Sequence, residues 1–213
     1  MKNKKLNILY EDKCIIVVYK ESGITTIKDK TNKINLYSMV YDYLHKKNQK
    51  VFIVHRLDKD TSGLVIFAKD EKIKNKLQDT WEDVIRKYYA VVHGISNKKG
   101  IIESYIKETK SLYCYSTKDK RGEYAKTIYE KVKNNKDYSL LRIEIKTGKK
   151  NQIRVHMKDN NTPILGDKKY GIKDNYKKMM LNAYYLCFKH PITKEKIEID
   201  TGIPKEFNGV FDK

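Results

Sequence analysis

The stretch VHRLDKDTSGLVIFAKD, residues 54–70, places charged and hydroxyl side chains between two aliphatic segments. Two strands that need only a turn can be joined by a dipeptide such as Asn-Gly or Asp-Gly. Here the connection carries His55, Arg56, Asp58 and further polar residues before Gly63. A strand that ends in charged residues delivers their side chains from a rigid support, as active sites often do. The stretch therefore predicts a functional loop that contains a carboxylate.

The composition indicates one globular domain with a polyanionic partner. A chain of 213 residues with 39% hydrophobic residues can form one sizeable core, and we predict a single domain over residues 1–213. Lys and Arg number 46 against 27 Asp and Glu, so the formal net charge is +19. This excess favours nucleic acid as the partner. A coding bias that makes the surface basic without any partner is the alternative, so charge must be combined with a site.

The chain is predicted to be cytoplasmic and reduced. It has no apolar run of membrane-spanning length, and its lysine-rich start lacks the apolar segment of a signal peptide. Cys14, Cys114 and Cys187 are odd in number and have no CxxC spacing, which predicts free thiols. The histidines show no HExxH-like spacing, so we expect no metal.

Hydrophobic periodicity predicts the α+β class. Helical spacing occurs over residues 36–47, 71–85 and 151–160, with Asp70 and Asn151 as candidate N-caps for the latter two. Residues 163–171 indicate a loop. Stretches rich in β-branched and aromatic residues predict strands at 13–24, 51–58, 63–70, 87–94, 100–108, 124–132, 138–147, 183–191 and 195–202. Together they predict a mixed, mainly antiparallel sheet with flanking helices.

HRLDKDTSGL at residues 55–64 resembles the central signature of the RluA family of pseudouridine synthases, H-R-L-D-x-x-T-S-G-L, at every fixed position. Further family motifs resemble VVYKESGI at 17–24, RKYYAVVHG at 86–94, GEYAKT at 122–127 and TGKKNQIRVHMKDNNTPILGDKKYG at 147–171. The resemblance covers most of the chain. It implies a curved sheet with a central catalytic cleft, in the short form without a separate N-terminal RNA-binding domain.

The resemblance also implies the catalytic residues. Asp58 would attack or deprotonate a uridine, so that the base detaches, rotates and rejoins its ribose through carbon without any cofactor. A carboxylate held out of bulk water needs a permanent cation nearby, and the family motif supplies Arg154. Tyr88 corresponds to the tyrosine that stacks on the target base. Arg56 resembles the arginine that enters the space left by the flipped base; a phosphate contact or a salt bridge to Asp60 is the alternative.

Two basic stretches that contain tyrosines are candidates for binding the RNA backbone. Residues 107–126 include Lys118, Lys120 and Arg121, which we predict to contact phosphates. Residues 167–178 are a second such stretch. Ordinary solvated loops are the alternative for both.

Two motifs depart from the family pattern. The last motif usually reads G-R-T-H-Q, whereas residues 148–152 read GKKNQ, so we expect altered RNA contacts. The first motif usually reads N-K-P-S-G, whereas residues 19–23 read YKESG, which leaves the rigidity and placement of that loop open. Asp58, Tyr88 and Arg154 all match their motifs.

The sequence thus predicts a monomeric, cofactor-independent pseudouridine synthase that acts on ribosomal or transfer RNA. A catalytically inactive RNA-binding protein of the same fold is the alternative, and the altered residues 148–152 are its best support. A metal-dependent nuclease using Asp58 and Asp60 would need further clustered carboxylates, which the sequence does not show.

Overall fold

The computed structural model describes residues 6–28 and 34–212, and these form two compact units. The first unit comprises residues 1–84 and 186–199, and the second comprises residues 85–185 and 200–213. We describe each unit by itself. The expectation of one catalytic domain over residues 1–213 stays a prediction.

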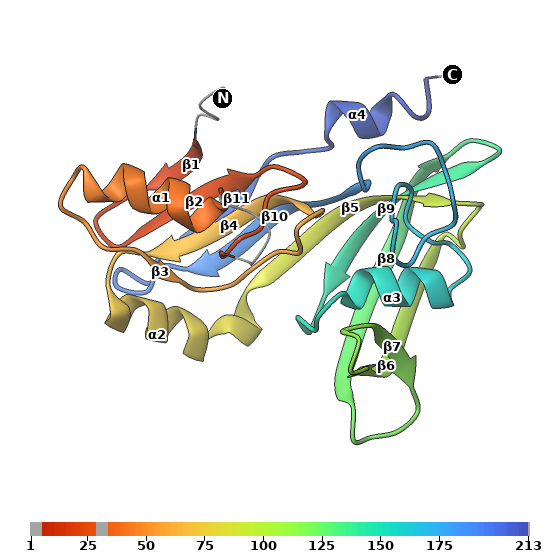
Figure 1. Ribbon diagram of the computed structural model, residues 1–213, viewed down its shortest axis with the longest axis horizontal. Helices are drawn as coiled ribbons and strands as arrows, with labels where there is room; N and C mark the ends of the chain where they lie inside the picture. The colour runs from red at the N-terminus through yellow and green to blue at the C-terminus, as the bar shows by residue number, and fades with distance from the viewer. Residues whose placement is uncertain (1–5, 29–33, 213) are drawn as a thin grey trace. The chain divides into compact units, whose positions relative to one another are not determined.

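The first unit is built on a sheet whose central strands are buried. Ile15 to Val18 of β2 are all 0% exposed, and because successive side chains of a strand point to opposite faces, both faces of the sheet are covered. Figure 1 shows α1 and α2 flanking these strands. The elements are β1 (Asn7–Glu11), β2 (Ile15–Lys20), α1 (Leu36–His45), β3 (Phe52–Ile53), β4 (Ser62–Ala68), α2 (Glu71–Asp79), the 3-10 turn η1 (Trp81–Asp83), the end of β10 (Leu181–Lys189) and most of β11 (Lys196–Asp200).

Antiparallel pairing fixes the register of this sheet. β2 lies between β1 and β4, and Lys20 at its end pairs with Gly63 at the start of β4. One face of the sheet packs on α2, with Ile15, Ile66 and Leu77 in the same apolar cluster. The predicted functional loop, residues 54–61, therefore leads into β4, in which every residue is buried.

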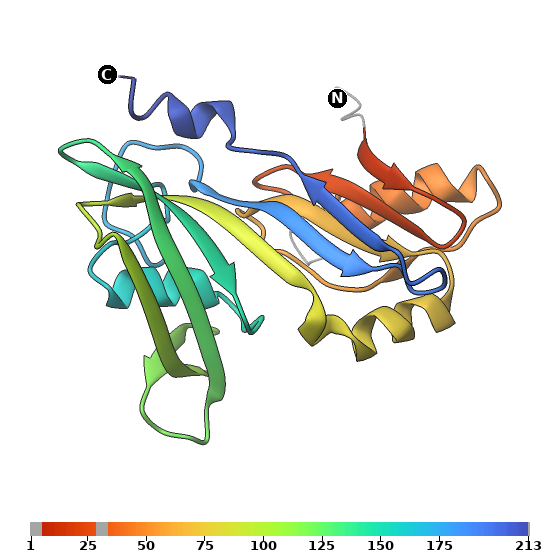
Figure 2. The same cartoon turned by 180° about the vertical axis from the view of Figure 1, so that it is seen from behind.

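The second unit is an antiparallel sheet in the order β5-β9-β8-β6-β7. α3 packs against the outer part of this sheet, where Val155 joins Ile106, Ala125 and Tyr170 in one cluster. Figure 2 shows β6 and β8 as long strands, whereas β7, which pairs with β6, has only four residues. The elements are β5 (Ile85–His93), β6 (Lys99–Glu108), β7 (Cys114–Thr117), β8 (Glu123–Asn134), β9 (Tyr138–Ile145), α3 (Gln152–Asp159), the first part of β10 and α4 (Lys205–Asn208).

The α+β class and the mainly antiparallel sheet with flanking helices are confirmed. Asp70 caps α2 as predicted, because its carboxylate accepts from the backbone N–H groups of Lys72 at 2.8 Å and Ile73 at 3.4 Å. The predicted helix over 71–85 was too long: it ends at Asp79, where the hydroxyl of Thr80 donates back to the carbonyl of Lys76.

Other predicted boundaries also changed. Only Phe52–Ile53 of the segment 51–58 is a strand, and the rest is a loop held by side-chain contacts. β1, β7 and α4 were not predicted. Cys14, Cys114 and Cys187 are free thiols. Within the described ranges no helix combines the length and apolar character needed to cross a bilayer.

Gly166 gives a testable consequence of this fold. Its φ is +75°, and a Cβ there would lie 2.1 Å from the carbonyl oxygen of Lys178. Gly94 has a similar φ of +77° but nothing within 4 Å of its Cβ position, so it is a matched control. We expect Gly94→Ala to lower the free energy of unfolding by about 1–2 kcal/mol and Gly166→Ala by about 3 kcal/mol or more. Urea denaturation measures both, and equal losses would contradict the close approach.

Candidate active site

The loop that carries Asp58 is held by the segment 20–26 of the first unit. The Thr26 hydroxyl donates to the carbonyl of Leu57 at 3.0 Å and accepts from the Leu57 N–H at 3.1 Å. On the other side of Asp58, the Gly23 N–H donates to the carbonyl of Lys59 at 2.9 Å. The backbone around Asp58 is thus fixed on both sides, while its side chain is half-buried.

Lys20 is a buried cation beneath this loop. Its side chain is 0% exposed, and Nζ donates to the carbonyls of Glu21 at 3.1 Å, Ile24 at 2.7 Å and Lys59 at 2.9 Å. Burial lowers the pKa of Lys20 to about 8, against the opposing effect of the carboxylates of Asp60 and Asp58. A positive charge therefore lies within electrostatic reach of Asp58.

These contacts show how the loop is held although residues 19–23 read YKESG and differ from the family motif N-K-P-S-G. Glu21 stands where the family motif has proline, but Lys20, Ser22 and Gly23 still make the anchoring contacts. The Ser22 hydroxyl donates to the carbonyl of Asp60 at 2.8 Å. Gly23 has a φ of +85°, a conformation that glycine adopts at low cost. The loop is held without the proline.

His55 is a support for the loop. Its Nε2 accepts from the backbone N–H of Ile66 in β4 at 3.1 Å, and its ring lies 4.5 Å from that of Trp81. Because Nε2 is occupied as an acceptor, this nitrogen is not available as a general base. Arg56, one residue further, is exposed. These contacts tie His55 to β4 and to Trp81 and give it a structural role in the loop.

In the second unit, Arg154 of α3 forms a buried bidentate pair with Asp167. Nε donates to Oδ2 and Nη2 donates to Oδ1, both at 2.8 Å. Arg154 is 7% exposed and Asp167 is 2% exposed. Burial alone would raise the pKa of Asp167, but the guanidinium outweighs it and holds that pKa below its ordinary value. Sequence reasoning missed Asp167, although it lies in the quoted motif 147–171.

Asn151 supports the same arginine. Asn151 is the N-cap residue of α3 as predicted, but its side chain makes no capping hydrogen bond, and its φ is +54°. Instead its Oδ1 accepts from Nη1 of Arg154 at 3.1 Å, and its Nδ2 donates to the hydroxyl of Tyr170 at 3.1 Å. The Tyr170 ring lies 4.9 Å from the guanidinium. Asn151 stands where the family motif has histidine, and the asparagine at this position helps to hold the guanidinium of Arg154.

Tyr88 lies on β5 opposite Ile143 of β9 and is 8% exposed. Its neighbour Tyr89 stacks on Tyr184 with the ring centroids 3.9 Å apart. The sheet therefore directs the two adjacent tyrosines differently. The role of Tyr88 toward a uridine stays a prediction.

The predicted phosphate contacts lie after β7. Lys118, Lys120 and Arg121 are all exposed, as a backbone-binding role requires. Arg121, however, pairs with Asp119, whose carboxylate accepts from its Nε at 3.0 Å and its Nη2 at 2.8 Å. Arg121 and Lys107 together hold the pKa of Asp119 far below its ordinary range. Part of the cationic charge of this loop is therefore already neutralised.

The structure thus divides the predicted residues between the units. Arg56 and Asp58 belong to the first unit, and Tyr88, Arg154 and the cations after β7 belong to the second. The pairing of Arg154 with Asp58 stays a prediction.

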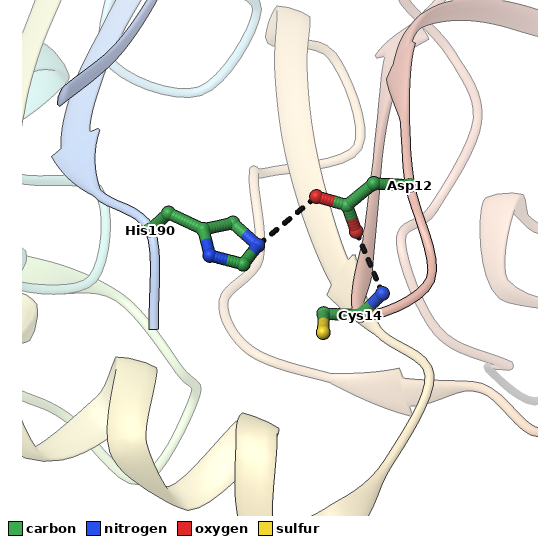
Figure 3. A group of neighbouring side chains, drawn as sticks. All are labelled: Asp12, Cys14 and His190. Carbon is green, nitrogen blue, oxygen red and sulfur yellow. Dashed lines mark hydrogen bonds and ion pairs between the residues drawn. The ribbon is translucent and has the colours of Figure 1, made fainter. Parts of the chain in front are cut away.

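Asp12, Cys14 and His190 gather in the first unit in a way that resembles a metal site (Figure 3). Nδ1 of His190 accepts from the backbone N–H groups of Ile192 at 3.2 Å and Thr193 at 3.0 Å, so the proton of the neutral ring is on Nε2. Nε2 faces Oδ2 of Asp12 at 3.0 Å. A cation would have to replace that proton. Burial also raises the pKa of the Cys14 thiol, which disfavours a thiolate ligand.

The buried pair gives a prediction for stability. Arg154→Ala leaves Asp167 buried without its guanidinium, and we expect a loss of about 3–5 kcal/mol in the free energy of unfolding. The control is Arg142→Ala, which removes an exposed pair at 3.5 Å from Glu130 and should cost less than about 1 kcal/mol. Denaturant titration of both variants checks this. Similar losses for the two would show that burial of the pair carries no special cost.

Comparisons with known proteins show which family the chain resembles. The sequence pattern of the family described as RNA pseudouridylate synthase matches residues 14–159. The ribosomal large subunit pseudouridine synthase D of Haemophilus influenzae is 32% identical, over 96% of this chain and 69% of that protein. The tRNA pseudouridine synthase C of Haemophilus ducreyi is 29% identical, over 98% of this chain and 96% of that protein.

A solved structure shows the same fold. The human RNA pseudouridylate synthase domain containing 4 protein superimposes with a TM-score of 0.80 at 21% identity, over 97% of this chain and 92% of that one. The match of the family pattern, the identity to curated relatives and the shared fold lead to one conclusion: this chain belongs to the RNA pseudouridine synthase family.

Proposed function

We propose that the protein isomerises specific uridines of ribosomal or transfer RNA, with Asp58 as the catalytic carboxylate. The observation that carries the assignment is the anchoring of the Asp58 loop, in which Lys20 and Gly23 hold the carbonyl of Lys59 and Thr26 holds Leu57. Such anchoring preorganises one carboxylate for reaction. Relatives named for ribosomal and for transfer RNA substrates support the RNA class.

The reaction needs no redox partner. The bond between N1 of the base and C1′ of the ribose breaks, the base rotates, and a bond from C5 to C1′ forms. The proton on C5 leaves and N1 gains one, so atoms and electrons balance within the nucleoside and water. Asp58 attacks or deprotonates the uridine. This balance is the reason that we propose a cofactor-independent and metal-independent enzyme.

Arg154 and Tyr88 complete the proposed catalytic set. Arg154 is rigid because Asp167 and Asn151 fix its guanidinium. We propose that N–H groups of this fixed guanidinium also donate to Asp58. Tyr88 would receive the extruded base, because unstacking a base costs free energy that a flat side chain recovers. Arg56, which is exposed, would fill the space that the base leaves.

The alternative, an inactive RNA-binding protein of the same fold, rested on the altered residues 148–152. The contacts of Asn151 with Arg154 count against it, because this departure keeps the arginine in place.

We further propose that the enzyme acts as a monomer in the cytoplasm, where its RNA substrates are found. A metal-dependent nuclease using Asp58 and Asp60 is excluded if the isomerisation of uridine persists in excess chelator.

The catalytic assignment is tested with Asp58→Asn, which keeps the shape of the side chain and removes its charge. We expect unchanged RNA affinity and a loss of at least about 1,000-fold in single-turnover rate, because a group that reacts is absent. The measurement is tritium release from RNA labelled at C5 of uridine, with RNA from a strain that lacks the gene. Near wild-type release by Asp58→Asn would contradict the assignment.

The same assay separates Tyr88 from its neighbour. Tyr88→Phe keeps the stacking ring and should lower the single-turnover rate without lowering affinity. Tyr89→Phe is the matched control, since Tyr89 packs on Tyr184, and should turn over normally.

The loop after β7 predicts a change in salt dependence. Each lost phosphate contact removes about 0.7–0.9 from the slope of log affinity against log salt. Lys118→Ala with Lys120→Ala should therefore flatten the slope, whereas Arg121→Ala should change it less because its guanidinium already pairs with Asp119. RNA affinity at several salt concentrations measures this. A wild-type slope in the double variant would show that the loop does not touch the backbone.

A further inference from the structure

Arg86 is a buried arginine on the same strand and the same sheet face as Tyr88. It lies two residues before Tyr88 in β5, and side chains two residues apart in a strand point to the same face. Arg86 is 7% exposed and Tyr88 is 8% exposed, whereas Ile85, on the opposite face, is 40% exposed. Their partners in β9 are Ile145 and Ile143. A permanent cation therefore lies on the face of the sheet where we propose that the target base is received.

The guanidinium of Arg86 lies against Gly148. A Cβ at Gly148 would be 2.9 Å from Nη1 of Arg86, a separation that Cβ atoms in proteins essentially never show. Gly148 does not have a positive φ, so this glycine provides space and not an unusual backbone conformation. Gly148 and Gln152 are also the two positions at which residues 148–152 keep the family motif G-R-T-H-Q.

Gln152 fixes the backbone on both sides of Gly148. Its Oε1 accepts from the hydroxyl of Thr147 at 2.7 Å and from the backbone N–H of Lys149 at 3.0 Å. Its Nε2 donates to the carbonyl of Lys126 at 3.0 Å. Gln152 is 3% exposed, so water does not compete for these hydrogen bonds. The segment 147–149 is therefore a rigid wall beside the guanidinium.

The reaction creates a negative charge on the base. When the bond between N1 and C1′ breaks, its electron pair stays with the base. The detached uracil therefore carries a negative charge, shared by N1, O2 and O4, until C5 bonds to C1′. Donors that are already in place stabilise such a charge without reorganisation. A guanidinium has five N–H donors in one plane, so it can keep a structural partner and still donate to the base.

We propose that Arg86 donates to the negatively charged base while the base is stacked on Tyr88, and that Gly148 gives the guanidinium the space for this position. Arg86 then acts on the base, whereas Arg154 acts on the carboxylate of Asp58. The inference rests on the proposed function, because it requires a uridine whose base detaches at Tyr88.

The first test removes the guanidinium. Arg86→Gln should lower the single-turnover rate of tritium release about 100-fold at saturating enzyme, with RNA affinity within about twofold of wild type. Arg86→Lys keeps the charge but not the planar set of donors, and should lose about tenfold. Lys87→Gln is the matched control. Lys87 points to the other face, where its Nζ lies 4.6 Å from the centroid of the Tyr185 ring, so this variant should stay within about twofold of the wild-type rate.

The second test displaces the guanidinium without removing it. The Cβ of Gly148→Ala must push Nη1 of Arg86 away, and we expect a loss of about tenfold in rate. Combined with Arg86→Gln, the same substitution should cost nothing further, because glutamine is too short to reach the wall. Gly94→Ala controls for a loss of stability alone, since nothing lies within 4 Å of its Cβ position, and should keep the wild-type rate.

Three outcomes would overturn the proposal. One is an equal rate for Arg86→Gln and Lys87→Gln. Another is an Arg86→Gln variant with weaker RNA affinity, a flatter salt dependence and a wild-type rate at saturation, because Arg86 would then bind a phosphate. The third is additive losses in the double variant, because Gly148 would then act independently of Arg86. If Arg86→Gln does not fold, Arg86→Lys and Gly148→Ala decide.

The two proposals fail in different ways. If wild-type protein releases no tritium from RNA, the proposed function fails. If wild-type protein releases tritium but Arg86→Gln and Gly148→Ala match Lys87→Gln and Gly94→Ala, only the assignment of Arg86 fails.

Discussion

The buried pair of Arg154 and Asp167 is the interaction on which the second unit depends. Neither charge could be buried alone, because the loss of hydration would cost several kcal/mol. The carboxylate is satisfied by the guanidinium and by the backbone N–H groups of Lys169 and Tyr170, at 2.9 Å and 3.0 Å. The loop 163–171 therefore folds around Asp167. Gly166, immediately before it, adopts the positive φ that this path requires.

The first unit uses a buried cation in another way. Lys20 has three carbonyl partners, which come from the segment 20–26 and from the loop of Asp58. One ammonium thus joins two segments that lie 39 residues apart. In both units a cation is removed from water and its donors are used to hold a loop. Each loop is therefore held by hydrogen bonds to a buried cation, which suits a site that must place one carboxylate accurately.

The departures from the family pattern become understandable in these terms. A position in a motif can be kept for the reaction or for the support of a reacting group. Asn151 can replace histidine because an amide also offers an acceptor for Arg154 and a donor for Tyr170. Glu21 can replace proline because the anchoring bonds come from the side chains of Lys20 and Ser22 and from the backbone of Gly23. At position 21 the anchoring bonds come from neighbouring residues, and at position 151 the amide itself supplies an acceptor and a donor.

The sequence by itself determined the family, the candidate carboxylate Asp58 and the α+β class, because these depend on contiguous motifs and on the spacing of apolar residues. The cap by Asp70 was predictable for the same reason: its partners lie two and three residues away. The true end of α2 and the short strand β7 were not predictable, because they depend on local competition and on pairing with β6.

The partners of the functional side chains were decided only by the tertiary structure. Asp167 lies 13 residues from its partner Arg154. The Tyr170 hydroxyl accepts a hydrogen bond from the backbone N–H of Cys114, which lies 56 residues away along the chain. The hydrogen bonds that join Gln152 to Thr127, Thr127 to His156 and His156 to Ser104 likewise link three elements, α3, β8 and β6. Spacing along the chain carries no information about such contacts. They form because buried polar groups must find hydrogen-bond partners wherever the fold brings donors and acceptors together.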